Sequence, residues 1–204
     1  MVIYRIKFLF FHIFLYIFLN AEALEYVKTP ATGLSFPAEI LLDSEEGLTK
    51  LHITGVATRT KFFMNIYSMA HYLRHPIYGK KNVIFDQILN DNQTKQINIK
   101  WVKDLDVAKM HNSFKESIEK AQAFYHFNVS NETEEFLSYF NDPIQKGDET
   151  IFRWFSGGLL EIEFNNEVIG LIESEEFAKT LWSIWFGPKS VVSRNRLISL
   201  LKTR

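Results

Sequence analysis

Cysteine is absent from the 204 residues, and proline and glycine are infrequent, with 5 and 9 residues. Without thiols the chain forms no disulfide, has no cysteine nucleophile and supplies no thiolate for a zinc or iron–sulfur site. An excess of basic charge is also missing, because 23 Lys and Arg residues face 24 Asp and Glu residues. Non-specific nucleic-acid binders need such an excess to displace counterions, so we expect no nucleic-acid partner.

The common catalytic and cofactor-binding motifs are missing as well. The chain contains no G-x-S-x-G, Walker A, G-x-G-x-x-G or H-E-x-x-H sequence. His71 and His75 are four residues apart, but on a strand this spacing does not place them side by side. Glu161 and Glu163 share one face of a predicted strand, where a solvated surface explains them. We therefore predict neither a metal nor a cofactor.

The first 23 residues have the organisation of a secretory signal peptide. Arg5 and Lys7 precede residues 8–19, which are apolar apart from His12, and an A-E-A sequence ends at residue 23. Twelve helical residues extend only about 18 Å, against a hydrocarbon core of about 30 Å, which disfavours an uncleaved membrane anchor. We expect cleavage after residue 23, no membrane span in the mature chain, and export to a bacterial periplasm.

Residues 24–204 are predicted to form one domain, because they contain no internal repeat, low-complexity tract or linker. With 47% apolar and 15% aromatic residues, the chain has enough apolar side chains to form a hydrophobic core. Strands rich in β-branched and aromatic residues are predicted at residues 34–42, 48–56, 61–73, 96–102, 150–155, 159–164 and 167–172. Strands, then helices, then strands and helices again are typical of an α+β fold.

The helices have recognisable starts. Asp106 precedes an apolar stripe with three- and four-residue steps, and Ser174 precedes a second such stripe. Asn131, with a glutamate three residues on, resembles a capping box and predicts another helix. Residues 83–89 and 190–201 are predicted to be helical as well.

Arg59 is the unusual residue of the first half of the chain. It stands between two long apolar strands, where the chain has to turn or bulge. The planar guanidinium suits recognition of a carboxylate or a phenolate in a concave site. The pattern alone equally allows a surface arginine, or one paired with an acid in the core.

Residues 54–73, with the sequence TGVATRTKFFMNIYSMAHYL, resemble the signature of the chalcone isomerase-like family. That signature is a turn with a glycine, then an arginine, then a strand that ends in an aromatic residue and a leucine. Residues 146–148 and 177–187 match further family segments in the same order. The resemblance implies a large antiparallel sheet with helices packed on one face, the open-faced sandwich of this family.

The family contains plant enzymes that close a chalcone to a flavanone, and relatives that bind fatty acids. The resemblance places the arginine that both kinds use at Arg59. The tyrosine that holds the fatty-acid carboxylate, which is a threonine in the enzymes, falls at Tyr67. The enzymes' other tyrosine falls near Val107, which donates no hydrogen bond, and an acid, Glu176, stands near a position where the enzymes carry a small hydroxyl residue or an alternative.

The leading hypothesis is an exported protein that binds a small hydrophobic carboxylate, expected to be a fatty acid, in a sheet–helix cleft without turning it over. Two alternatives stay open: an intramolecular lyase of the chalcone isomerase type, with Arg59 as its catalytic residue, and a structural or interaction protein of the cell envelope. The predicted ligand-binding residues are Arg59, Tyr67, Asn65, Met69, Val107 and Met110.

Overall fold

A computed structural model describes residues 25–44 and 47–202, and its largest element is a seven-stranded antiparallel sheet. The order of the strands across the sheet follows their order along the chain, so each strand pairs with the next. The predicted signal peptide lies outside the described residues, as do residues 45 and 46 of a predicted turn. The strands are β3 (Glu39–Ser44), β4 (Gly47–Lys61), β5 (Met64–Leu73), β6 (Lys95–Trp101), β7 (Glu149–Trp154), β8 (Leu159–Phe164) and β9 (Glu167–Glu173).

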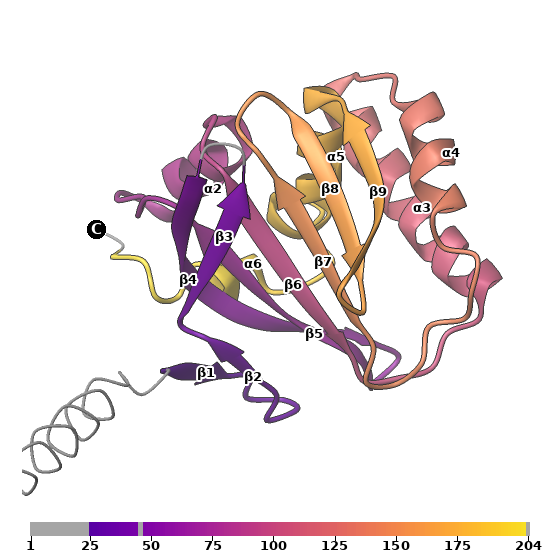
Figure 1. The fold of residues 1–204 in the computed structure, drawn as a ribbon, viewed down its shortest axis with the longest axis horizontal. Helices are drawn as coiled ribbons and strands as arrows, with labels where there is room; N and C mark the ends of the chain where they lie inside the picture. The colour runs from indigo at the N-terminus through magenta and orange to yellow at the C-terminus, as the bar shows by residue number, and fades with distance from the viewer. Residues whose placement is uncertain (1–24, 45–46, 203–204) are drawn as a thin grey trace, which may run out of the picture.

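Helices pack over one face of this sheet (Figure 1), which confirms the predicted α+β open-faced sandwich. The helix α5 is the most deeply buried, since nine of its twelve residues are buried, as expected of a helix that is apolar on most sides. Within the part of the chain that the structure describes, no helix is both long and apolar enough to cross a membrane. The helices are α2 (Lys81–Asn90), α3 (Val107–Tyr125), α4 (Ser130–Ser138), α5 (Glu175–Phe186) and the short α6 (Arg194–Leu197).

A small hairpin of β1 (Tyr26–Lys28) and β2 (Ser35–Pro37) covers part of the opposite face. Phe36 of β2 is fully buried against the side chains of β4 and β5, and the hydroxyl of Tyr72 donates to the carbonyl of Pro37 over 3.0 Å. Because both faces are covered there, residues 53–57 of β4 are buried without the alternation of a half-exposed strand.

The predicted starts of the two longest helices are confirmed. The carboxylate of Asp106 accepts the backbone N–H of Lys109 over 2.8 Å at the start of α3. The hydroxyl of Ser174 accepts the backbone N–H of Phe177 over 3.2 Å at the start of α5. Each of these bonds satisfies one of the N–H groups that the first turn of a helix leaves without a partner.

The hairpin between β4 and β5 differs from the prediction. The strand β4 continues to Lys61, and the turn consists of Phe62 and Phe63. Both residues have a left-handed backbone, with φ of 51° and 64°, a conformation that asparagine and glycine adopt more readily than phenylalanine. The sequence therefore carries no turn signal at this point. The bulge predicted near Arg59 is present, because the strand register shifts between Arg59 and Thr60.

Two predicted helix features are wrong. Asn131 does not cap α4, because the helix begins at Ser130 and its N-cap residue makes no side-chain hydrogen bond. The predicted helix over residues 190–201 is reduced to the four residues of α6. Contacts with other segments replace the helical hydrogen bonds there, since the Ser190 hydroxyl donates to the Trp185 carbonyl over 2.6 Å and the N–H of Leu200 donates to a carbonyl of β4.

Gly55 provides a test of how α6 packs on β4. A Cβ atom at Gly55 would overlap the backbone of Arg196 and Leu197, and backbone cannot move aside as a side-chain tip can. We expect Gly55→Ala to lower the free energy of unfolding by about 1–3 kcal/mol, as for an overpacked core. Chemical denaturation measures the change, and an unaltered midpoint would show that α6 does not pack on β4 as described.

Candidate functional site

Arg59 and Tyr67 are cross-strand neighbours at one end of the sheet. Arg59 of β4 lies directly opposite Tyr67 of β5 in the antiparallel register, and Tyr67 in turn lies opposite Trp101 of β6. Residues directly opposite each other project from the same face. Tyr67 belongs to the core under the helices, so all three side chains lie on the helix-covered face.

These side chains contribute to a cavity of about 260 Å³ between the end of the sheet and the helix α3, which we call the apolar cavity. Arg59, Lys61 and polar residues of α3 line one part of it. Its larger apolar and aromatic lining residues are Ile66, Tyr67, Trp101, Leu105, Met110, Phe114, Ile184 and Val191.

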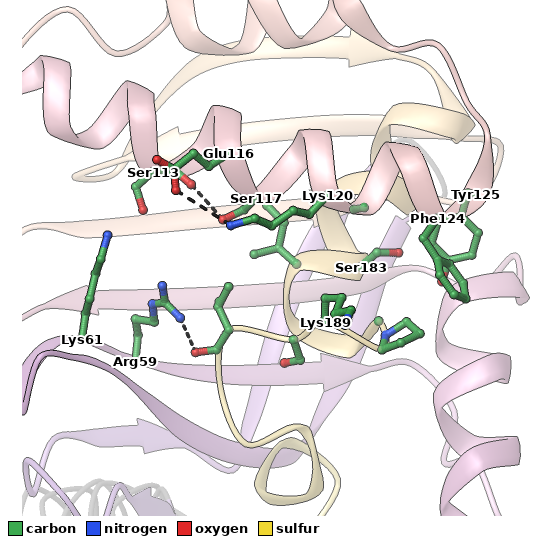
Figure 2. A pocket seen from close by; sticks show the side chains of 16 residues that line it. Arg59, Lys61, Ser113, Glu116, Ser117, Lys120, Phe124, Tyr125, Ser183 and Lys189 are labelled. Atoms are coloured by element: carbon green, nitrogen blue, oxygen red, sulfur yellow. Dashed lines mark hydrogen bonds and ion pairs between the residues drawn. The ribbon is translucent and has the colours of Figure 1, made fainter.

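A second cavity, of about 220 Å³, adjoins the first and shares Arg59 and Lys61 with it; we call it the basic cavity (Figure 2). Two further lysines, Lys120 and Lys189, also line it. The one carboxylate among its lining residues belongs to Glu116, which is paired with Lys120 over 3.9 Å. Arg59 thus lies where an apolar compartment meets one rich in positive charge.

The guanidinium of Arg59 is half-buried, and its hydrogen bond goes to a backbone carbonyl. Its Nη1 donates to the backbone carbonyl of Val191 over 2.7 Å, the dashed bond from Arg59 in Figure 2. Among the described residues no carboxylate forms an ion pair with it. An arginine has five N–H donors, so one carbonyl leaves most of its capacity available to an anion in either cavity.

The hydroxyl of Tyr67 is held as a hydrogen-bond donor. The indole Nε1 of Trp185, on α5, donates to the Tyr67 oxygen over 2.9 Å. Indole N–H can only donate, so the tyrosine oxygen accepts this bond and directs its own proton elsewhere. Burial raises the pKa of Tyr67 to about 12, although the bond from Trp185 and the charge of Arg59 act in the opposite direction. The hydroxyl is therefore protonated at neutral pH.

The ring of Trp101 packs against the ring of Tyr67. The rings of Tyr67 and Trp101 meet edge to face, with centroids 5.1 Å apart and planes at 73°. Trp101 itself donates from Nε1 to the hydroxyl of Thr150 over 2.9 Å. Two tryptophans with satisfied N–H groups thus hold a tyrosine that is only 7% exposed.

The six residues predicted to bind ligand are divided between the cavity and its surroundings. Arg59, Tyr67 and Met110 line the apolar cavity. The fully buried Met69 lies in the core, Val107 is the first residue of α3, and Asn65 accepts a hydrogen bond from the Thr60 hydroxyl beside the hairpin turn. These last three are not among the cavity's lining residues. Trp101 and Trp185 were not among the predicted site residues, although a tryptophan in an apolar stripe generally has an N–H that needs an acceptor.

The other polar groups considered from the sequence line neither cavity. Glu161 and Glu163 both pair with Arg153, with Glu163 at 2.7 Å, and all three side chains are largely buried rather than solvated. The imidazole of His71 is buried against Phe186, and burial holds its pKa well below the usual range. Among the described residues, no three histidine or carboxylate side chains come together in a way that could hold a metal ion.

The sequence profile of the chalcone isomerase-like family matches residues 29–196, and the chain therefore belongs to that family. Among solved structures, the crystal structure of a fatty-acid binding protein of Arabidopsis thaliana has the same fold. The two chains superpose with a TM-score of 0.70 over 85% of this chain and 96% of the plant protein, at 17% sequence identity. No curated protein matches the sequence. The resemblance predicted from residues 54–73 is thus confirmed at the level of family and fold.

The raised pKa of Tyr67 predicts how stability depends on alkaline pH. An unfolded tyrosine ionises near pH 10, whereas folded Tyr67 stays protonated up to about pH 12. The contribution of protonated Tyr67 to the free energy of unfolding is complete below about pH 10 and is lost as the pH rises from about 10 to about 12. We expect denaturation midpoints of the wild type to fall more steeply in this interval than those of Tyr67→Phe. If the midpoints of the two proteins fell in parallel with pH, Tyr67 would ionise as freely in the folded protein as in the unfolded chain.

Proposed function

We propose that this protein binds a fatty acid, with the carboxylate at Arg59 and Tyr67 and the acyl chain in the apolar cavity. The observation that carries the proposal is the half-buried guanidinium of Arg59, which faces the cavity without an ion-pair partner among the described residues. A buried charge is costly unless it is paired, so such a site favours an incoming anion.

A carboxylate matches the donors that the site presents. The planar guanidinium offers parallel N–H groups to both oxygens of a carboxylate, and bonds to an ionised group are shorter and stronger than neutral ones. The protonated hydroxyl of Tyr67 adds a third donor directed toward the same anion. Because Tyr67 stays protonated up to about pH 12, this donor is retained throughout the physiological range.

An acyl chain matches the rest of the cavity. Away from the polar residues of α3, the lining includes Ile66, Leu105, Met110 and Phe114, which offer no side-chain hydrogen-bond donor and favour an apolar ligand. The similar fold of the Arabidopsis fatty-acid binding protein supports the same class of ligand.

We propose that the bound acid is released without chemical change. The resemblance places a catalytic tyrosine of the isomerases near Val107, whose side chain donates no hydrogen bond and does not line the apolar cavity. A second support is the raised pKa of Tyr67, which makes this hydroxyl a poor proton donor in the sense of acid catalysis while leaving it a good hydrogen-bond donor.

Arg59→Ala is the direct test of the carboxylate site. We expect the affinity for a long-chain fatty acid, measured by calorimetry, to fall by roughly 10- to 150-fold, the equivalent of about 1.5–3 kcal/mol for hydrogen bonds to a charged group. Tyr67→Phe removes a neutral donor and should have a smaller effect, of about 2- to 10-fold.

Arg196→Ala is the matched control, because Arg196 is an exposed arginine of α6 that lines neither cavity. The affinity of Arg196→Ala for the fatty acid should equal that of the wild type. Equal affinities of Arg59→Ala and the wild type would contradict the carboxylate site. Cyclisation of a chalcone faster than in buffer, and slowed by Arg59→Ala, would contradict binding without turnover and favour the lyase.

We also propose export to a bacterial periplasm, on the evidence of the basic start, the short apolar segment and the A-E-A sequence at residues 21–23. The full-length chain, produced in a bacterium and recovered from the periplasm, should have the intact mass of residues 24–204. Recovery of the uncut chain from the membrane fraction would instead support an anchor, and recovery of it from the cytoplasm would contradict export.

A further inference from the structure

The turn between β4 and β5 exposes two aromatic side chains. Phe62 is 79% exposed and Phe63 is 103% exposed, the latter as open as in an extended peptide. Both have positive φ, the conformation of a two-residue turn in which asparagine and glycine are favoured. Local backbone preference therefore does not explain these phenylalanines, and neither does packing within the described protein.

Positive charge surrounds this turn. The ammonium of Lys61 lies 5.9 Å from the centre of the Phe62 ring. Met64, which follows Phe63, is 46% exposed, and its sulfur lies 3.0 Å from the ammonium of Lys103, two residues after β6. We call Phe62, Phe63 and Met64 the aromatic tip. It is a convex apolar projection with a lysine on each side.

The aromatic tip is close along the chain to residues that line the two cavities. Lys61, which immediately precedes it, lines both the apolar and the basic cavity, and in Figure 2 its side chain lies across from Ser113 of α3. Ile66, two residues beyond Met64, also lines the apolar cavity. A surface that bound the aromatic tip would therefore lie close to the two cavities that Arg59 lines.

We propose that the aromatic tip inserts into the surface of an anionic lipid bilayer and so places the cavity against the membrane, where the fatty acid of the proposed function is exchanged. Phenylalanine rings enter the boundary between headgroups and acyl chains, and lysines beside them are attracted to anionic headgroups. The purpose of this docking rests on the proposed function, whereas the insertion itself does not.

The shape of the tip favours a bilayer over a protein partner. Two phenylalanine side chains bury about 150–250 Å² each, so together they supply roughly half of the 800 Å² per partner of a standard protein interface. A narrow projection needs a deep complementary pocket in a folded partner, but it enters a fluid lipid surface without one.

A fluorescent label at the tip measures insertion directly. Because the chain has no cysteine, Met64→Cys in the full-length chain accepts a single environment-sensitive fluorophore and keeps both phenylalanines. Vesicles of phosphatidylglycerol and phosphatidylcholine in equal parts should shift its emission to the blue and raise its intensity several-fold. The same fluorophore at Asn82→Cys, an exposed position on α2, should not respond, even if another segment attaches the chain to the vesicle.

Phe62→Asn/Phe63→Gly separates insertion from folding. The pair Asn-Gly suits the observed positive φ values, so this variant should be at least as resistant to heat as the wild type. With the label at Met64→Cys, however, it should lose most of the response to vesicles. An undiminished response in this variant would overturn the role of the aromatic tip.

The lysines have their own test. Lys103→Gln should weaken partition into the anionic vesicles about fivefold, the factor expected for one lysine near such a surface, whereas Lys81→Gln on α2 should leave it unchanged. Equal binding to vesicles of phosphatidylcholine alone would overturn the anionic requirement. No response to any vesicle, with a response to a purified protein partner instead, would overturn membrane docking altogether.

Fatty-acid binding and membrane docking can each be contradicted without affecting the other. Phe62→Asn/Phe63→Gly should bind a fatty acid from solution with wild-type affinity, while Arg59→Ala should insert its labelled tip normally and lose fatty-acid affinity. Insertion without any fatty-acid binding would contradict the proposed function alone, and fatty-acid binding without insertion would contradict the docking alone.

Discussion

The hydrogen bond from Trp185 to Tyr67 is the interaction on which the character of the site depends. Because the indole donates, the tyrosine oxygen must accept, and the phenolic proton is directed away from the indole. The same bond joins α5, the most buried helix, to the strand β5. Burial then raises the pKa of Tyr67 to about 12, so the group stays a donor. A fixed donor beside an arginine is the arrangement on which the proposed binding of a carboxylate rests.

Strand register brings the two ligand-binding candidates together, and the bulge after Arg59 ends the regular pairing beside them. The chain then turns through Phe62 and Phe63 before it returns as β5. The arginine, the tyrosine and the exposed aromatic turn therefore belong to one hairpin, which forms part of the wall of the cavity. Binding of a fatty acid and docking of the cavity on a lipid surface are two proposed uses of this single structural unit.

Residue patterns predicted the features that depend on neighbours in sequence. Alternation and β-branched residues predicted the meander of β7, β8 and β9, and the caps Asp106 and Ser174 were correct because a cap involves residues three positions apart. The helix predicted over residues 190–201 failed, since contacts of that segment with β4 and α5 replace the helical hydrogen bonds.

By itself the sequence determined the α+β fold, the absence of thiol chemistry and the candidacy of Arg59 and Tyr67, because composition, periodicity and a family signature are properties of the linear chain. Only the tertiary structure decided that Met110 lines the cavity while Met69 lies in the core, since both are apolar residues on suitable faces. It also decided that Arg59 meets no acid among the described residues. An ion pair depends on which side chains meet in space, and no spacing along the chain encodes that.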